Sequence, residues 1–110
     1  MKDINQLHHN SYGIAFKWES NIMNTAAIQL VFRDINMSLP LSKLHVFLNN
    51  VQKTLSEEPI KPITDNNSKS YVLETPSSLI SLVMSFNELE NLQDLLEGAI
   101  FKINMEIMLN

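Results

Sequence analysis

Few residues of this chain have the type and spacing that chemistry requires. His8 and His9 are adjacent, and imidazole is the commonest metal ligand in proteins. Neighbouring residues of a strand point to opposite faces, so two such rings do not easily reach one ion. No nearby cysteine or Glu-x-x-His pattern completes a ligand set. We therefore predict no metal site, and we place both histidines in a flexible arm over residues 1–10.

Three carboxylates near the C-terminus share one predicted helix face. Glu90, Asp94 and Glu97 follow the i, i+4, i+7 spacing of a helix. Such a face can bind a cation weakly, but a solvated helix surface is the simpler interpretation. The chain has two glycines, Gly13 and Gly98, so it lacks a glycine-rich phosphate loop. No nucleophile lies in a recognisable pattern with a base. The sequence therefore predicts no enzymatic activity and no cofactor.

Aromatic and aliphatic residues alternate in the first strong strand pattern. Tyr12, Ile14, Phe16 and Trp18 fall on one face, which we predict to be the inner layer of a sheet. Aromatic stripes beside a cation can also stack single-stranded bases. Lys17 is the one charge nearby, and the chain carries a net charge of -4 with scattered cations. Nucleic-acid binding is therefore disfavoured, because it needs a basic surface.

Size and composition agree with one folded domain over residues 1–110. A chain of 110 residues with 45% hydrophobic content can bury a core without staples. It has no cysteine, and therefore no disulfide framework and no zinc–thiolate site. The polar first ten residues lack the apolar region of a signal peptide. The apolar runs are far shorter than the roughly 20 residues that span a bilayer. We expect a cytoplasmic protein without a membrane segment.

Hydrophobic periodicity predicts strands followed by a helix in the first half. In chain order these are strands over 11–18, 26–32 and 35–41 and a helix over 43–55. Arg33 and Asp34 fit a two-residue hairpin turn. Pro40 ends the third strand or places it at an edge. Ser42 is the expected N-cap of the helix. A polar connector with two prolines follows over 56–69.

The second half repeats the change from strand to helix. In chain order its pattern predicts strands over 71–74 and 79–86 and a helix from residue 88. Asn87 is the expected N-cap, and Glu90, three residues later, would complete a capping box. The apolar stripe continues past Gly98 to Ile107, so we expect one helix of about 20 residues. Gly98 then marks a kink or a close packing contact.

The two halves coincide when the first is shifted by 45 residues. Ser42 then meets Asn87, and each position predicted to be buried is apolar in both copies. We interpret this as an internal duplication, with repeat units over 11–55 and 70–110. It predicts an α+β fold in the order strand-strand-strand-helix-strand-strand-helix. About five strands would form one antiparallel sheet with a pseudo-twofold axis and both helices on one face.

A resemblance to a known family rests mainly on residues 75–99. Thr75 and Pro76 precede Ser-Leu-Val-Met-Ser-Phe-Asn-Glu-Leu-Glu-Asn-Leu, and this stretch resembles a family of short bacterial proteins of unknown function. A weaker match covers 35–51. The resemblance implies a hairpin, a strand ending in a capped helix, a loop, and then a second strand and helix. Some members carry a cysteine pair that this chain lacks, so no metal role is carried over. The repeat is also similar to strand-helix segments of PUR-type and Whirly-type nucleic-acid domains, whose basic surface is absent here.

Self-association is the leading functional hypothesis. The C-terminal segment is apolar on more than one side, and the outer face of the predicted sheet is small and poor in charge. The candidate interaction residues are Phe101, Met105, Ile107, Met108, Leu109, Val31 and Val83. We predict a protein-interaction domain that forms a homodimer, with an unknown protein as a further partner. A single-stranded nucleic-acid site and a small-ligand pocket between sheet and helices are the alternatives.

Overall fold

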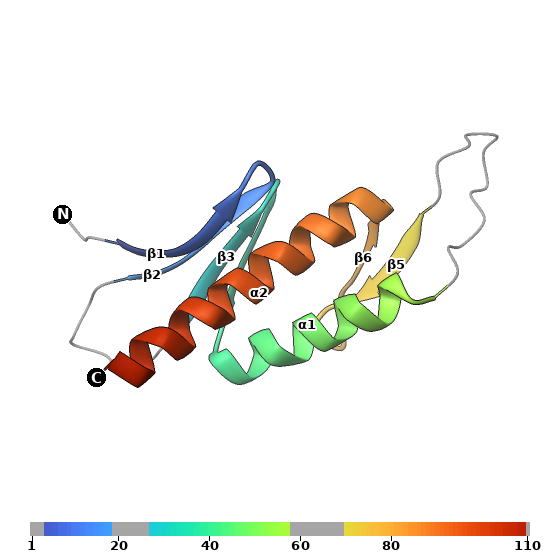
Figure 1. Ribbon diagram of the computed structural model, residues 1–110. Helices are drawn as coiled ribbons and strands as arrows, with labels where there is room; N and C mark the ends of the chain where they lie inside the picture. The colour runs from blue at the N-terminus through green and yellow to red at the C-terminus, as the bar shows by residue number, and fades with distance from the viewer. Residues whose placement is uncertain (1–3, 19–26, 58–69, 110) are drawn as a thin grey trace.

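The computed structural model describes residues 4–18, 27–57 and 70–109 and confirms the α+β class. Figure 1 shows two long helices beside antiparallel strands. In chain order the elements are β1 (Ile4–Asn10), β2 (Gly13–Trp18), β3 (Ile28–Phe32), β4 (Ile35–Leu39), α1 (Leu41–Leu55), β5 (Tyr71–Glu74), β6 (Ser81–Met84) and α2 (Phe86–Leu109). Most of the predicted connector, residues 58–69, lies outside the described residues.

The strands form two sheets, and the prediction of one five-stranded sheet was wrong. One sheet has the order β1-β2-β3-β4, and β5 and β6 form a separate two-stranded sheet. The additional strand is β1, which pairs antiparallel with β2 in the region predicted to be a flexible arm. Its sequence is mostly polar, so hydrophobic alternation could not reveal it. Pairing with β2 and contacts with α2 stabilise it instead.

The two helices form the centre of the molecule. They pack side by side, run in opposite directions and lie on the same side of the four-stranded sheet (Figure 1). Helix α2 contacts β1 and β2, whereas α1 contacts β4 and β5. Leucines and aromatic residues fill the space between these elements. The largest fully buried side chains include Phe47, Leu30, Leu44, Leu73, Leu89, Leu92 and Leu96.

The hairpin of β3 and β4 agrees with its prediction. Phe32 is paired with Ile35 across a turn made of Arg33 and Asp34. Arg33 has a φ of 53°, in the left-handed region. The favoured two-residue hairpin turns have positive φ at their first central position, because the twist of such a turn matches that of the strands. The strand period places Ile28 and Phe32 in the core, as expected.

Strand β2 presents the opposite face from the one we predicted. Ala15 is fully buried, and Lys17 reaches Glu106 on α2. Phe16 and Trp18 therefore lie on the outer face of the sheet, away from the helices. The physical reason is the close approach of α2 to this hairpin. A small residue and an extended lysine fit between strand and helix, whereas large aromatic rings do not.

Helix α2 begins two residues earlier than the sequence predicts. Ser85 is its N-cap: its hydroxyl accepts from the backbone N–H of Glu88 at 3.1 Å, and the Glu88 carboxylate accepts from the N–H of Ser85 at 3.0 Å. This is a reciprocal capping box. Asn87 is therefore inside the helix, and its side chain donates to the hydroxyl of Tyr12 instead. Glu90 is not part of the cap.

Helix α1 also begins earlier than predicted, so Ser42 is not its cap. Pro40 occupies the N-cap position and supplies no side-chain hydrogen bond. The helices start at Leu41 and Phe86, which are still 45 residues apart. The elements β3, β4 and α1 thus occur in the same order as β5, β6 and α2.

Strand β6 is shorter than predicted. Ile80, which the sequence placed in this strand, lies before it and is exposed.

Helix α2 continues through Gly98 without interruption. A Cβ atom at Gly98 would lie only 2.3–2.5 Å from three ring atoms of His8. The glycine therefore lets the His8 ring of β1 lie directly against the helix. This close packing determines how near the hairpin of β1 and β2 comes to α2.

We expect Gly98→Ala to destabilise the protein, although at an exposed helix position alanine is more stabilising than glycine by about 1 kcal/mol. Overpacking against the His8 ring should cost about 1–3 kcal/mol, which exceeds that gain. Urea unfolding followed by circular dichroism measures the change in the free energy of unfolding.

The control is the same substitution in a His8→Ala background. There the ring is gone, so Gly98→Ala should become neutral or stabilising, and the double-mutant cycle isolates the contact. A stabilising effect of Gly98→Ala in the wild-type background would contradict the close packing.

Candidate interaction surfaces

The seven candidate interaction residues lie on three separate surfaces. Val31 is half-buried on the outer face of the four-stranded sheet. Val83 is 68% exposed on the outer face of the β5–β6 hairpin. The remaining five form the end of α2, which we call the helix end: Phe101, Met105, Ile107, Met108 and Leu109. The structure therefore does not unite the seven in one site.

The helix end is the most exposed of the three. Phe101, Met108 and Leu109 are 66%, 84% and 81% exposed, and Met105 is 41% exposed. Phe101, Met105 and Met108 have the i, i+4, i+7 spacing that places them on one face. That face points to solvent, since the residues on the opposite side of the helix, such as Ile103, are buried.

Ile107 is exposed for a different reason. It follows Ile100 and Ile103 along the line of α2 residues that face the core, and both of these are buried. Ile107 itself is 62% exposed. The elements that cover Ile100 and Ile103 therefore leave Ile107 uncovered, although neighbouring Glu106 still contacts β1 and β2. Within the described residues, no element covers the Ile107 side chain, which is therefore available for packing against a partner.

The outer face of the four-stranded sheet contains an aromatic pair. Phe16 and Trp18 pack edge to face with ring centroids 5.2 Å apart, and Trp18 is 47% exposed. Cross-strand pairing places Val31 beside Ile14 on the same face. The described strand residues of this face include no lysine or arginine: Ile4, Gln6, His9, Ile14, Phe16, Trp18, Gln29, Val31, Asn36 and Ser38.

Lys17 cannot contribute charge to that face. Its ammonium group lies on the helix side, where it donates to Glu106 at 3.2 Å. The same carboxylate accepts from the side chain of Asn5 at 2.9 Å. The cation that the sequence placed beside the aromatic stripe therefore connects β2 to α2 instead.

The third surface, on the β5–β6 hairpin, is small. Val72 and Val83 are paired across the two strands and both are exposed. Leu79 and Ile80, just before β6, are 92% and 52% exposed. Isolated apolar residues of this kind are normal on a protein surface, and these four are interspersed with exposed Glu74 and Ser81.

Polar side chains hold β1 against α2. The His8 ring lies 3.0 Å from the carboxylate of Asp94. The side chain of Asn10 donates to the same carboxylate at 3.1 Å and to the carbonyl of Asn91 at 2.9 Å. His9 lies on the outer face and contacts Gln6 rather than the helix. The two histidines thus have different neighbours, and sequence spacing gave no signal of the Asp94 contact.

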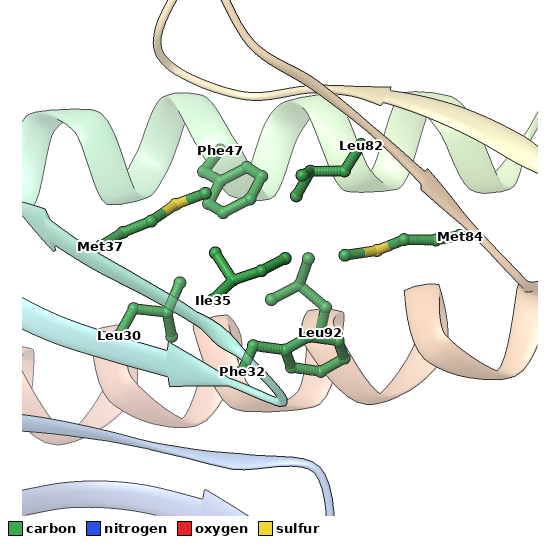
Figure 2. A pocket seen from close by; sticks show the side chains of 8 residues that line it. All are labelled: Leu30, Phe32, Ile35, Met37, Phe47, Leu82, Met84 and Leu92. Carbon is green, nitrogen blue, oxygen red and sulfur yellow. The ribbon is translucent and has the colours of Figure 1, made fainter.

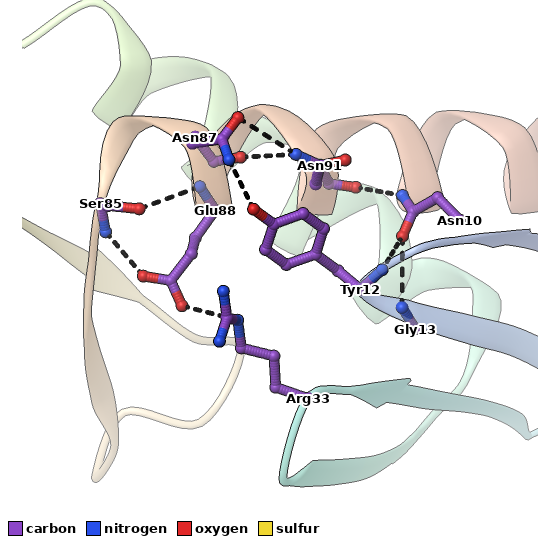
Figure 3. Close-up of polar contacts among 8 residues, drawn as sticks. All are labelled: Asn10, Tyr12, Gly13, Arg33, Ser85, Asn87, Glu88 and Asn91. Atoms are coloured by element: carbon purple, nitrogen blue, oxygen red, sulfur yellow. Dashed lines mark hydrogen bonds and ion pairs between the residues drawn. The ribbon is translucent and has the colours of Figure 1, made fainter.

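A second set of contacts connects the hairpin turns to the start of α2 (Figure 3). Arg33 donates to the carboxylate of Glu88 at 3.1 Å, and its guanidinium lies 4.7 Å from the centre of the Tyr12 ring. Tyr12 stacks on Phe32 at 5.7 Å. Glu88 therefore caps its own helix and also binds the turn between β3 and β4. We interpret these contacts as structural, because each of these side chains is already bound by another part of the chain.

The same contacts shift two carboxyl groups. The hydrogen bond from Asn10, and then the hydrogen bond and charge of His8, hold the pKa of Asp94 below its ordinary value, although burial acts in the opposite direction. The hydrogen bond from Asn5, followed by contacts with Lys17, likewise lowers the pKa of Glu106. Both carboxylates therefore favour the folded state when ionised.

The pocket between the larger sheet, the helices and β6 offers little room for a ligand. Eight apolar side chains from β3, β4, α1, β6 and α2 converge in the space between these elements (Figure 2). The space left between them is about 10 Å³, close to the minimum for one water molecule. Ligand pockets are roughly 300–1,000 Å³. A small-ligand site at this place would require the side chains to move apart.

Two further observations concern the described part of the chain. It contains no cluster of three or more His, Cys, Asp or Glu side chains arranged to hold a metal ion. None of its helices is long and apolar enough to cross a membrane.

Comparisons with models of protein families, with curated proteins and with solved structures found no match to this chain.

We expect the free energy of unfolding to fall as the pH drops below about 4.5. The unfolded carboxyl groups of Asp94 and Glu106 bind protons near their ordinary values of 3.8 and 4.5, whereas the folded groups stay ionised to lower pH. The unfolded state then binds more protons, so stability decreases. Urea unfolding at a series of pH values measures the slope.

The double substitution Asp94→Asn with Glu106→Gln should make this slope shallower. Glu90→Gln is the matched control, because Glu90 is exposed on the same helix, and it should keep the wild-type slope. An unchanged slope in the double variant would show that these contacts do not contribute to acid sensitivity.

Proposed function

We propose that this protein is a small interaction domain without enzymatic activity that self-associates as a homodimer through the helix end. The observation that carries the proposal is the exposure of five neighbouring apolar side chains, between 41% and 84%, on the last turns of α2. Four of the five, Phe101, Met105, Met108 and Leu109, lie on one side of the helix, and contiguous apolar patches commonly mark contact sites. Burial of this patch against a second copy would remove it from water.

The helix end is favoured over the other two surfaces by area. At about 200 Å² for a large apolar side chain, the exposed parts of Phe101, Met105, Met108 and Leu109, which lie on one side of the helix, amount to about 500 Å². A standard interface takes about 800 Å² from each partner. The helix end alone therefore supports a modest interface. The outer sheet face is more buried and more polar, and the hairpin face is smaller.

The alternatives have weaker support. A single-stranded nucleic-acid site on the outer sheet face would use Phe16 and Trp18 for stacking, but the described strand residues there supply no cation, and the chain has a net charge of -4. A ligand pocket between sheet and helices would have to open first. A different protein is the other candidate partner for the helix end. A wild-type chain that stays monomeric would favour that partner over a second copy.

Three other inferences from the sequence stay predictions. They are the cytoplasmic location, the relation to the short bacterial proteins of unknown function, and the duplication of a strand-strand-helix unit. The separation of 45 residues between the two helix starts supports the duplication. A single domain over residues 1–110 is likewise a prediction, which rests on the length of the chain.

Sedimentation velocity between about 1 and 100 µM tests the proposal, because interfaces of this size often have micromolar affinity. The wild-type chain should shift from monomer to dimer, and Phe101→Glu should raise the dissociation constant at least about tenfold by placing two carboxylates in one apolar contact. Truncation after Gly98 is unsuitable, since it would remove buried Ile100 and Ile103.

Val83→Glu is the matched control. Val83 is 68% exposed and Phe101 is 66% exposed, so the two substitutions place the same charge at equally accessible positions. Circular dichroism should show that both variants stay folded. A wild-type chain that remains monomeric throughout, or a dimer that is broken by Val83→Glu and not by Phe101→Glu, would overturn the proposal.

A further inference from the structure

One solvent-facing line of α2 changes character along its length. Its six residues recur at intervals of four, three, four, four and three, so they share one helix face. All six are exposed. The line consists of Glu90, Asp94, Glu97, Phe101, Met105 and Met108. Its first half is acidic and its second half is apolar, which restricts how two copies of α2 can meet.

A parallel arrangement of the two helices is disfavoured by charge. Helices in contact have axes about 8–10 Å apart, so each carboxylate of the acidic half would face its own copy. This distance is comparable to the screening length of about 8 Å at physiological ionic strength, so salt does not remove the repulsion between the facing carboxylates. Asp94 is already bound by His8 and Asn10, but Glu90 and Glu97 would repel their copies.

A fully overlapping antiparallel arrangement is disfavoured by desolvation. Two helices that cross near Gly98 would place the apolar half of each copy over the acidic half of the other. The carboxylates would then lose water without gaining a partner, which is costly. His8 also lies against the helix at Gly98 and restricts access to this part of α2.

We infer that two copies meet tail to tail, with their α2 helices antiparallel and with Met105 beside the twofold axis. This inference rests on the proposed self-association. Phe101 of each copy then lies near Met108 of the other, so apolar groups meet apolar groups. Glu97 lies eight residues from Met105, about 12 Å along the helix. The two copies of Glu97 are then about 24 Å apart along the axis, beyond the range of strong repulsion.

Such a contact is isologous, because the same patch is used by both copies and the assembly closes as a dimer. With axes about 8–10 Å apart and Cα atoms about 2.3 Å from each axis, the facing Cα atoms nearest the twofold axis come within about 3.4–5.4 Å. This range overlaps the usual Cα separation in a disulfide. Met105 is therefore the position at which a cysteine would bond to its own copy.

The absence of cysteine from the chain makes this directly testable. Single-cysteine variants Met105→Cys, Phe101→Cys and Glu90→Cys are oxidised under air, and covalent dimer is measured on non-reducing gels. Met105→Cys should cross-link to itself at least about tenfold faster than the other two. A mixture of Phe101→Cys and Met108→Cys should cross-link faster than either variant alone. Glu90→Cys is the control for the acidic half.

The outcomes separate the arrangement from the proposed function. Sedimentation of the reduced variants shows first whether each one still dimerises. A dimer in which Glu90→Cys and Phe101→Cys cross-link to themselves as fast as Met105→Cys would show a parallel contact and overturn the arrangement alone. A dimer in which none cross-links would place the contact elsewhere and overturn it as well. A wild-type chain that does not dimerise would overturn both proposals.

Discussion

The structure depends on the burial of helix α2 on more than one side. Leu89, Leu92 and Leu96 form a fully enclosed line within it, and α1 and the hairpin of β1 and β2 pack against the same helix. The capping box of Ser85 and Glu88 determines where this helix begins. Glu88 also binds Arg33, so the start of α2 is connected to the turn of the hairpin that supplies the sheet side of the core.

The hairpin of β1 and β2 packs on α2 in an unusual way. Its inner face contributes small or polar residues, such as Ala15, His8 and Asn10, whereas its outer face carries Phe16 and Trp18. Gly98 permits this close approach by leaving room for the His8 ring. Hydrogen bonds and ion pairs to α2 thus replace part of the apolar packing expected under a sheet, and the aromatic residues are displaced to the surface.

Helix α2 therefore combines two properties that occupy different parts of its length. Its first half is enclosed by partners on several sides and stabilises the fold. At its end, one face of the helix points to solvent although Glu106 still contacts β1 and β2, so Phe101, Met108 and Leu109 remain in water. Exposure of this kind has a free-energy cost that a second copy can remove. The acidic residues of the first half confine that contact to the helix end, because charge and desolvation both oppose a longer overlap.

Local periodicity in the sequence determined the β3–β4 hairpin, strand β5, both helices and the apolar helix end, because these features depend on residues close in the chain. It did not reveal polar β1, the outward orientation of Phe16 and Trp18, or the separation of β5 and β6 from the larger sheet. The first two depend on contacts of distant residues, His8 with Gly98 and Lys17 with Glu106, and the third on which strands pair in the folded chain. Only the tertiary structure decided them, since the same alternation fits either face of a strand until a helix packs against one of them.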